Sequence, residues 1–282
     1  MRVLITGAGG LLAGAVTREF SGGTDVVALD RAALDISDDA RVHRTITDIR
    51  PDAIINCAAY NDVDGAEDNA ERALRVNALA VRALARAACD RHAVFVHYST
   101  DFVFGGDATR PYREDDPPNP RGVYAASKLL GEWLAQQRST SYVLRVESLF
   151  GKPGPGGTRQ GSVGGIVTRI RAGEPVPVFV DRTVSPSYTI DVARATRLLL
   201  ERRAEPGLYH CVNSGSATWA DVAAEAARLL NLPLNIKPMT LETAALKAPR
   251  PKYCAMDNAK LKAAGIEMPT WQDALKRHLL GI

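Results

Sequence analysis

The chain opens on a short apolar run that passes directly into a glycine-rich turn. Residues 2–5 are β-rich and apolar, which is typical of a strand buried in a parallel sheet. The turn over residues 6–14 follows at once, with glycines at positions 7 and 10, and a helical segment then runs to about residue 20. Glycines between a strand and a helix let the backbone approach a pyrophosphate, whose charge the helix N-terminus favours. A glycine motif alone is weak evidence, but its place in a strand–turn–helix unit predicts a dinucleotide site.

A second strand is expected over residues 25–30, and it ends on the carboxylate of Asp30. Asp30 lies about 20 residues beyond the glycines, where an acid usually binds the adenosine ribose hydroxyls of a dinucleotide. The alternative is that Asp30 is a turn residue at the end of a strand. Arg31 leaves the cofactor open, because a guanidinium there can meet a 2′-phosphate. We therefore expect NADPH or NADH as the cofactor, with modest discrimination between them.

Strand-like and helical segments alternate through the first half of the chain. Apolar runs at 52–57, 93–98 and 141–146 are typical of strands, and an alanine-rich helical region spans about 63–90. This alternation predicts a Rossmann-like, doubly wound parallel sheet of the α/β class. Ligands of such sheets bind beyond the carboxyl ends of the strands. The glycine turn, Asp30, Ala58, Ala59, Ser99 and Thr100 all fall at such ends.

The second half of the chain is less regular. Its stretch 152–165 is too glycine-rich to be rigid, and it is expected to be either a lid over a substrate or a plain connection. Helices are expected over 166–172, 190–203, 218–230 and 271–280, and strands over 176–180 and 208–213. His97 and His210 lie in strand-like runs, and we expect packed core residues there rather than ligands.

Tyr124 and Lys128 are four residues apart in a segment expected to be helical. That spacing puts both side chains on one face of the helix, about one turn apart. An ammonium beside a phenol favours the phenolate, so the tyrosine pKa should fall below its ordinary value of about 10. Such a tyrosine can exchange a proton near neutral pH. A chance pair on the surface is the alternative interpretation of these two residues alone.

Composition argues against several classes of function. A formal charge of +3 is too small to suggest a nucleic acid or an anionic membrane as partner. There is no signal-peptide pattern, and no apolar run approaches the ~20 residues of a membrane helix. The four cysteines are scattered without a CxxC spacing, which argues against zinc or a disulfide scaffold and for a reduced, cytoplasmic compartment. We expect no metal site.

Several longer segments add to these motifs. They are 58–67 (AAYNDVDGAE), 98–104 (YSTDFVF), 111–112 (PY), 124–132 (YAASKLLGE), 207–210 (GLYH) and 249–251 (PRP), together with Leu261, Pro269 and Trp271. As a set they resemble the extended short-chain dehydrogenase/reductase superfamily, and within it the dTDP-4-dehydrorhamnose reductase family. The resemblance covers nearly the whole chain. It implies a cofactor domain of residues 1–146, rejoined by part of 176–215, and a smaller, discontinuous α/β substrate domain drawn mainly from 147–282.

The resemblance also implies the chemistry, which is reduction of a nucleotide-linked 4-ketosugar by NADPH or NADH. The favoured substrate is dTDP-4-dehydro-L-rhamnose, and a homodimer is a further expectation. Thr100, Tyr124 and Lys128 would form the catalytic set. Tyr124 would protonate the developing alkoxide, Thr100 would hydrogen-bond the same oxygen, and Lys128 would hold the nicotinamide ribose and tune Tyr124.

Two further groups of contacts are expected. Cofactor contacts are expected from Gly7, Gly9, Gly10, Leu11, Leu12, Asp30, Arg31, Asp35, Ile36, Ala58, Ala59, Tyr60, Asn77, Ser99, Tyr124 and Lys128. Substrate contacts are expected from Thr100, Asp101, Phe102, Ser148, Arg182 and Arg250. The two arginines would meet the diphosphate, which needs cationic partners when it is buried. Solvated surface charge is the alternative interpretation for each arginine.

The sequence departs from the family pattern where the sugar nucleotide is expected. Phe102 stands where a tyrosine is usual, Glu147-Ser148 replaces a Ser-Trp pair, and Tyr253-Cys254 replaces Asn-Ser. Residues 181–187 (DRTVSPS) replace the usual Asp-Gln-x-Gly-x-Pro-Thr. Reductase chemistry is therefore better supported than rhamnose as the product. Two alternatives stay open: another sugar-nucleotide enzyme such as an epimerase or dehydratase, and a non-catalytic nucleotide-binding regulatory subunit.

Overall fold

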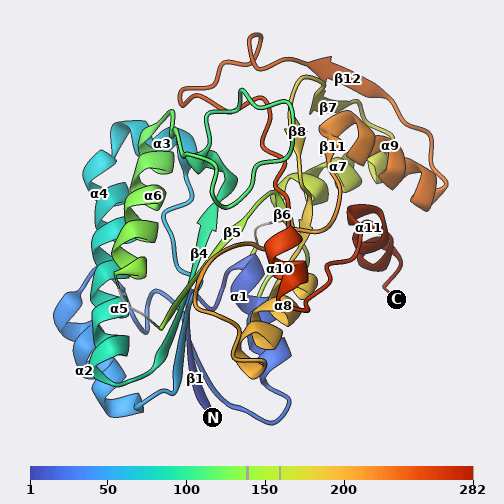
Figure 1. Cartoon of the computed structure of the whole chain (residues 1–282). Helices are drawn as coiled ribbons and strands as arrows, with labels where there is room; N and C mark the ends of the chain where they lie inside the picture. Colours follow the sequence, from blue (N-terminus) through green and yellow to red (C-terminus); the bar gives the residue numbers. More distant parts are fainter. Residues whose placement is uncertain (138–139, 159, 282) are drawn as a thin grey trace.

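A parallel sheet forms the centre of the molecule, for which the computed structural model describes residues 1–137, 140–158 and 160–281. The strand order is β2–β1–β3–β4–β5–β10. The strands are β1 (Arg2–Thr6), β2 (Asp25–Leu29), β3 (Ala53–Asn56), β4 (Val94–Thr100), β5 (Ser141–Val146) and β10 (Gly207–His210). Helices cover both faces of this sheet (Figure 1). The doubly wound α/β architecture predicted from the sequence is confirmed.

Each face of the sheet carries its own apolar core, because successive side chains of a strand point to opposite sides. Val3 and Ile5 belong to the core shared with α1 (Leu11–Phe20) and α8 (Thr189–Glu201). Leu4 belongs to the opposite core, which is completed by α2 (Asp39–Ile49), α5 (Ala80–Asp90) and α6 (Val123–Gln136). Burial on both faces is the reason that these strands read as continuous apolar runs.

The helical region expected over 63–90 is confirmed, although it is built from several pieces. These are α3 (Val63–Asp68), α4 (Ala70–Leu74), a π-helical turn (Arg75–Leu79) and α5. The side chain of Asp38 caps α2 by accepting a hydrogen bond from the backbone nitrogen of Arg41. No described helix combines the length and apolar character that crossing a membrane requires.

The second half of the chain builds a smaller lobe around a separate core (Figure 1). Its main elements are α7 (Gly161–Ala172), β7 (Val176–Phe179), α9 (Trp219–Leu230), β12 (Ile236–Met239) and α11 (Trp271–Leu280). The two-residue strands β6 (Leu149–Phe150), β8 (Thr183–Val184), β9 (Ser187–Tyr188) and β11 (Ala217–Thr218) add to it. The short helix α10 (Ala259–Ala263) instead returns Leu261 to the core around α1 and α8.

Two sequence expectations need correction. The stretch 152–165 is not irregular throughout, because α7 begins at Gly161 and buries Val163 completely. The burial of this side chain outweighs the poor helix propensity of the neighbouring glycines. The strand expected over 208–213 ends at His210. His97 and His210 are both fully buried, as expected of core residues.

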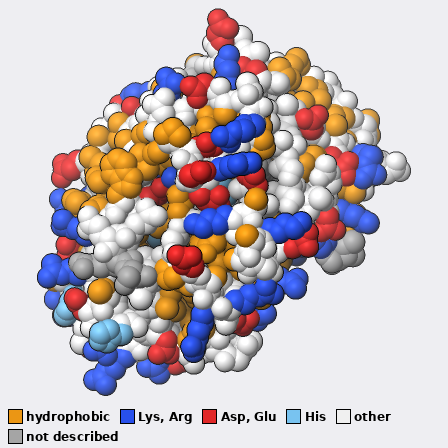
Figure 2. All heavy atoms as spheres, viewed as in Figure 1, with side chains coloured by type: hydrophobic (Ala, Val, Ile, Leu, Met, Phe, Trp, Pro, Cys, Tyr) orange, Lys and Arg blue, Asp and Glu red, His pale blue; other side chains and the backbone are white. Residues whose placement is uncertain are grey.

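The surface carries charges of both signs. Figure 2 shows Lys and Arg side chains lying beside Asp and Glu side chains across the face in view. Ion pairs among the described residues include Arg110–Asp116 at 2.7 Å and Arg250–Asp64 at 3.0 Å.

Candidate active site

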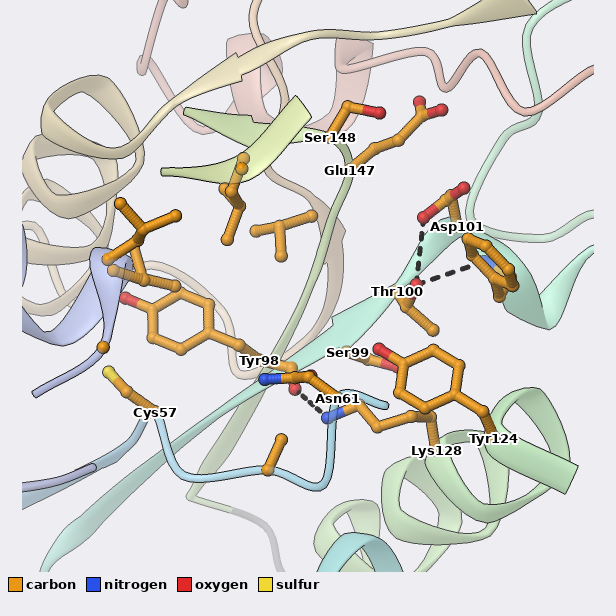
Figure 3. Close-up of a pocket in the computed structure, with 18 of the residues that line it drawn as sticks. Cys57, Asn61, Tyr98, Ser99, Thr100, Asp101, Tyr124, Lys128, Glu147 and Ser148 are labelled. Carbon is orange, nitrogen blue, oxygen red and sulfur yellow. Dashed lines mark hydrogen bonds between the residues drawn. The ribbon is translucent and has the colours of Figure 1, made fainter. Parts of the chain in front are cut away.

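A cavity of about 380 Å³ opens at the carboxyl ends of the central strands (Figure 3). Its walls come from the glycine turn, the loop after β3, the ends of β4 and β5, α6 and the start of α7. The predicted site residues that line it are Gly10, Leu11, Leu12, Ala58, Ala59, Ser99, Thr100, Asp101, Phe102, Tyr124, Lys128 and Ser148. They converge because the carboxyl ends of all the strands of a parallel sheet meet at one edge.

The turn after β1 requires glycine at position 7. Gly7 has a φ of +76°, and a Cβ added there would lie 2.9 Å from the backbone nitrogen of Ala58. The backbone nitrogen of Gly10 donates a hydrogen bond to the Gly7 carbonyl at 2.9 Å, which closes the turn just before α1. The bare backbone at a helix N-terminus is suited to an anionic pyrophosphate.

The glycine-rich stretch after β6 packs directly on this turn. The backbone nitrogen of Gly154 donates to the Gly10 carbonyl at 3.3 Å. A Cβ added to Gly14 would lie 2.5 Å from the Gly154 Cα, so the two segments meet only because both lack side chains. This part of the stretch therefore lies against the turn at which the cavity begins.

Lys128 is held in the floor of the cavity by a backbone group. Its Nζ donates a hydrogen bond to the carbonyl oxygen of Tyr98 at 2.5 Å and lies 3.5 Å from His97 Nε2. Only 2% of the residue is exposed, and this burial lowers the pKa of Lys128 to about 8, against an opposing effect of Glu132. The ammonium form is therefore retained at neutral pH, but with a much smaller margin than in an exposed lysine.

A buried chain of hydrogen bonds fixes the imidazole behind Lys128. Asn56 Oδ1 accepts from Thr6 Oγ1 at 2.6 Å and from the Ala58 backbone nitrogen at 3.2 Å. Its Nδ2 must then donate to His97 Nδ1, 3.1 Å away. Burial, with the charge of Lys128, lowers the pKa of His97 well below its usual value, so the neutral ring carries its proton on Nε2. That proton faces Lys128 Nζ, 3.5 Å away.

Tyr124 and Thr100 bring their hydroxyl groups to the same part of the cavity (Figure 3). The ring of Phe102 meets the ring of Tyr124 edge-on, with the centroids 5.7 Å apart. Thr100 Oγ1 donates to Asp101 Oδ1 at 2.9 Å and accepts from the backbone nitrogen of Phe102 at 3.2 Å. A ligand oxygen at this point would compete with Asp101 for the Thr100 proton.

The residues expected at the adenosine lie outside the lining of this cavity, beyond the end of β2. Asp30 is exposed, and its Oδ1 accepts a hydrogen bond from the Ala33 backbone nitrogen at 2.8 Å. Arg31 pairs with Asp35 at 3.3 Å, and both side chains are accessible to solvent. Ile36 is a buried core residue. Asp30 therefore does serve as a turn residue, and its second carboxylate oxygen makes no hydrogen bond with the residues that the structure describes.

Asn77 supports the cavity wall from behind. Its Oδ1 accepts from the Tyr60 backbone nitrogen at 2.8 Å, and its Nδ2 donates to the Tyr60 carbonyl and to Ser127 Oγ, both at 3.0 Å. Both ends of the amide are thus bonded within the chain. The arrangement fixes the loop after β3 against α6, so it positions Ala58 and Ala59 in the cavity wall.

The two predicted arginines meet at Phe102 but do not line the cavity. The guanidinium carbons of Arg182 and Arg250 lie 5.1 Å and 5.8 Å from the centre of its ring. Arg182 Nη2 pairs with Asp101 Oδ2 at 3.4 Å, and Arg250 Nη2 pairs with Asp64 Oδ2 at 3.0 Å. Each positive charge is therefore partly neutralised within the chain.

A second cavity of about 260 Å³ lies next to the first, and Ser162 lines both. Its walls include Phe179, Trp219, Arg169 and Arg182. Aromatic surfaces and cations thus share one hollow of the smaller lobe.

Glu147 lines the main cavity, although the sequence prediction did not include it among the site residues. It directly follows Val146, the last residue of β5, so the carboxyl-end rule that selected Ser99 and Thr100 also applies to it. A carboxylate oxygen of Glu147, a carboxylate oxygen of Asp101 and the sulfur of Cys254 lie within 4.8 Å of one another. The Arg182 guanidinium already supplies positive charge to this set. Ser148, with a φ of +46°, turns the chain sharply after Glu147.

Comparison of the chain with known proteins identifies the family to which it belongs. The family described as RmlD substrate binding domain matches residues 1–281. A dTDP-4-dehydrorhamnose reductase of Streptomyces griseus is 37% identical over 284 aligned residues, covering 97% of this chain and 91% of the relative. The spore coat polysaccharide biosynthesis protein SpsK of Bacillus subtilis is 33% identical, covering 99% and 96%. The crystal structure of dTDP-4-dehydrorhamnose reductase from Bacillus anthracis in complex with NADP has a TM-score of 0.93 at 32% identity, covering 100% and 99%.

Proposed function

We propose a function from one premise: the chain belongs to the family of the RmlD substrate binding domain. On that premise it is an NAD(P)H-dependent oxidoreductase that reduces the keto group of a nucleotide-linked 4-ketosugar. The favoured reaction converts dTDP-4-dehydro-L-rhamnose to dTDP-L-rhamnose, or reduces a closely related deoxysugar. The observation that carries the proposal is the meeting of Thr100, Tyr124 and Lys128 in one cavity beside the glycine turn.

The glycine turn fits the pyrophosphate of NADPH or NADH. No side chain can stand at position 7, and Gly10, Leu11 and Leu12 leave open space at the start of α1. Asp30 and Arg31 would hold the adenosine ribose, and Lys128 the nicotinamide ribose. When it is bound, the reduced nicotinamide supplies the hydride for the keto carbon. We favour NADPH because the related reductase of Bacillus anthracis contains NADP, while Asp30 keeps NADH usable.

Three side chains of this protein would complete the reduction. Tyr124 gives its phenolic proton to the keto oxygen as negative charge develops there, so that a new O–H bond balances the new C–H bond. Thr100 turns from Asp101 and donates a hydrogen bond to the same oxygen. The Lys128 ammonium favours the phenolate that remains on Tyr124, which regains its proton from solvent.

The substrate's nucleoside diphosphate would occupy the smaller lobe. The cavity shared through Ser162 offers Phe179 and Trp219 to a base, and Arg169 and Arg182 to phosphate oxygens. Arg250, beside Phe102, would be a further diphosphate partner. We infer that residues 1–146, with part of 176–215, form the cofactor domain, and that most of 147–282 forms the substrate domain.

We also infer a homodimer and a cytoplasmic site of action. Leu74, Leu79 and Trp133 expose between 38% and 55% of their surface on α4, the π-helical turn and α6, which favours a partner there. The four cysteines are free, in keeping with a reducing compartment. Light scattering, which measures the molar mass in solution, would test the dimer. The wild type should be dimeric, and Trp133→Glu should be monomeric.

The reductase proposal is tested by oxidation of NADPH and NADH with a panel of nucleotide-linked 4-ketosugars. Turnover with at least one of them is expected, together with free exchange of cofactor. Failure of every ketosugar to oxidise either cofactor would contradict the proposal. An oxidised cofactor held tightly through purification would instead favour an epimerase or dehydratase. Binding of NADPH or NADH without turnover of any ketosugar would favour the regulatory alternative.

A further inference from the structure

One carboxyl oxygen in the main cavity has no partner among the described residues. Glu147 is only 2% exposed and lines the cavity. Its Oε2 accepts a hydrogen bond from the Ser185 backbone nitrogen at 2.6 Å. Its Oε1 is buried and makes no hydrogen bond within the described chain. A buried oxygen without a partner costs about 1–3 kcal/mol, so its position beside a ligand cavity calls for an explanation.

The guanidinium of Arg182 does not donate a hydrogen bond to Glu147 Oε1. The contacts of Arg182 Nη2 go to Asp101 at 3.4 Å and to Cys254 Sγ at 3.5 Å, and its buried Nε makes no hydrogen bond to any residue that the structure describes. One cation thus faces two carboxyl groups. Burial, with the charge of Asp101, raises the pKa of Glu147 well above its usual value, which favours a neutral acid. Because Oε2 accepts from Ser185, the proton of that acid belongs on Oε1, where it makes a donor.

The Glu147 carboxyl group lies near the residues of the proposed reacting centre. Thr100 Oγ1, which would bind the keto oxygen, is 2.9 Å from Asp101 Oδ1. Carboxylate oxygens of Asp101 and Glu147 lie within 4.8 Å of each other. Figure 3 shows the Asp101 and Glu147 carboxyl groups on the same side of the cavity, beyond Thr100 as seen from Tyr124. A substituent on the carbon next to the keto carbon would therefore extend toward Glu147.

We propose that Glu147 determines substrate specificity by hydrogen-bonding the hydroxyl group on the sugar carbon next to the keto carbon. This inference rests on the proposed reductase function and narrows its substrate class. The sugar must retain the hydroxyl at C3, because C5, the other neighbour of a C4 ketone, carries the ring oxygen and C6 and has no hydroxyl group. A sugar without that hydroxyl would leave the Glu147 oxygen buried and unpaired in the complex. Sites built to hydrogen-bond a hydroxyl discriminate strongly against analogues that lack it.

The test compares three substrates: the dTDP-linked 4-keto-6-deoxyhexose, its 3-deoxy analogue and its 2-deoxy analogue. For the wild type, kcat/KM should fall at least ~10²-fold with the 3-deoxy sugar. The 2-deoxy sugar serves as the positional control and should lose much less. Equal kcat/KM for the 3-hydroxy and 3-deoxy sugars would overturn the specificity role while leaving the reductase function standing. Absence of turnover with every ketosugar would remove the proposed function, and the inference with it.

Two variants assign the effect to Glu147. Glu147→Gln keeps an acceptor for Ser185 and places an amide donor where Oε1 stands, so the preference for the 3-hydroxy sugar should persist. Glu147→Leu removes the partner, so kcat/KM should fall only for the 3-hydroxy sugar and the preference should shrink toward unity. NADPH affinity measured alongside verifies the fold, and it should match wild type in both variants. A preference retained in folded Glu147→Leu would overturn the assignment. If that variant does not fold, the wild-type comparison still tests the requirement for the 3-hydroxyl group, and equal kcat/KM for the two sugars would overturn the proposal.

Discussion

Lys128 Nζ and the carbonyl oxygen of Tyr98 lie 2.5 Å apart, so the ammonium is tied to the backbone of β4 inside the core. The lysine is therefore fixed before any ligand arrives. Burial lowers the pKa of Lys128 to about 8, which makes its charged form a source of instability in the folded protein.

The first prediction follows from that pKa. An unfolded lysine keeps its proton up to about pH 10.5, so between pH 8 and 10.5 the unfolded state binds more protons than the folded one. The free energy of unfolding should therefore rise with pH in this window, by up to roughly 3 kcal/mol. Below pH 8 the destabilisation is present in full. Urea unfolding at about pH 7 and about pH 10 measures the rise in the wild type. Lys128→Met lacks the titrating group, so its free energy of unfolding should not show this rise.

Lys237 supplies the matched control, since it is an exposed lysine. Lys237→Met should keep the wild-type pH dependence. A Lys128→Met variant that also gained stability with pH, as wild type does, would show that another group titrates in this window.

The second prediction separates the roles of Tyr124 and Lys128. Tyr124→Phe removes the proton donor but keeps the ring packed against Phe102, so turnover should fall by roughly 10²–10⁴-fold. That loss corresponds to about 3–5 kcal/mol in the activation barrier. NADPH affinity should stay within a few-fold of wild type, whereas Lys128→Met should lower both quantities. Turnover close to wild type in Tyr124→Phe would rule out the proposed proton transfer.

The third prediction concerns cofactor choice. Asp30→Asn keeps an acceptor for the Ala33 backbone nitrogen, which Asp30→Ala loses, so the pair separates the charge of Asp30 from its role in the turn. Both variants should shift the NADPH/NADH ratio of kcat/KM toward NADPH, because a carboxylate repels a 2′-phosphate. Arg31→Ala should shift the ratio the other way. An effect confined to Asp30→Ala would mean that Asp30 acts through the turn and not through the ribose.

The fourth prediction tests the diphosphate partner. Arg250→Ala removes a cation that sits over Phe102, so the apparent KM should rise far more than kcat falls, as loss of uniform binding does. Arg250→Lys should recover part of the loss through its charge. Arg113→Ala, an exposed arginine paired with Asp257, provides the control and should leave KM unchanged. If Arg250→Ala left KM unchanged, Arg250 would have no role in substrate binding.

The sheet and the cofactor side of the cavity could be predicted from sequence because their signals are local. Buried parallel strands such as β1 form apolar runs, and the residues after them fall at one edge of the sheet by topology. The substrate side offers weaker signals. Strands β6, β8, β9 and β11 have two residues each, which is too short for a readable alternation.

Long-range packing accounts for what the sequence did not predict. Val163 lies between glycines that favour a loop, but its burial in the core of the smaller lobe stabilises helix α7. Glu147 follows the end of a strand, and the resemblance placed Asp101 and Arg182 in one substrate site. The ion pair between these two residues and the contact of Arg182 with Cys254 are visible only in the structure. Those proximities join residues far apart in the chain, and only the fold brings them together.

The position of β10 has a consequence for synthesis of the protein on the ribosome. This strand, residues 207–210, covers the edge of β5, and α8 covers the apolar face of α1, which was made almost 180 residues earlier. A nascent chain that has passed β5 therefore has an unpaired strand edge and an open hydrophobic surface until the later segment emerges. Such surfaces favour aggregation and chaperone binding. A fragment ending at residue 146 should therefore be insoluble when expressed, whereas one that continues past β10 can close its sheet.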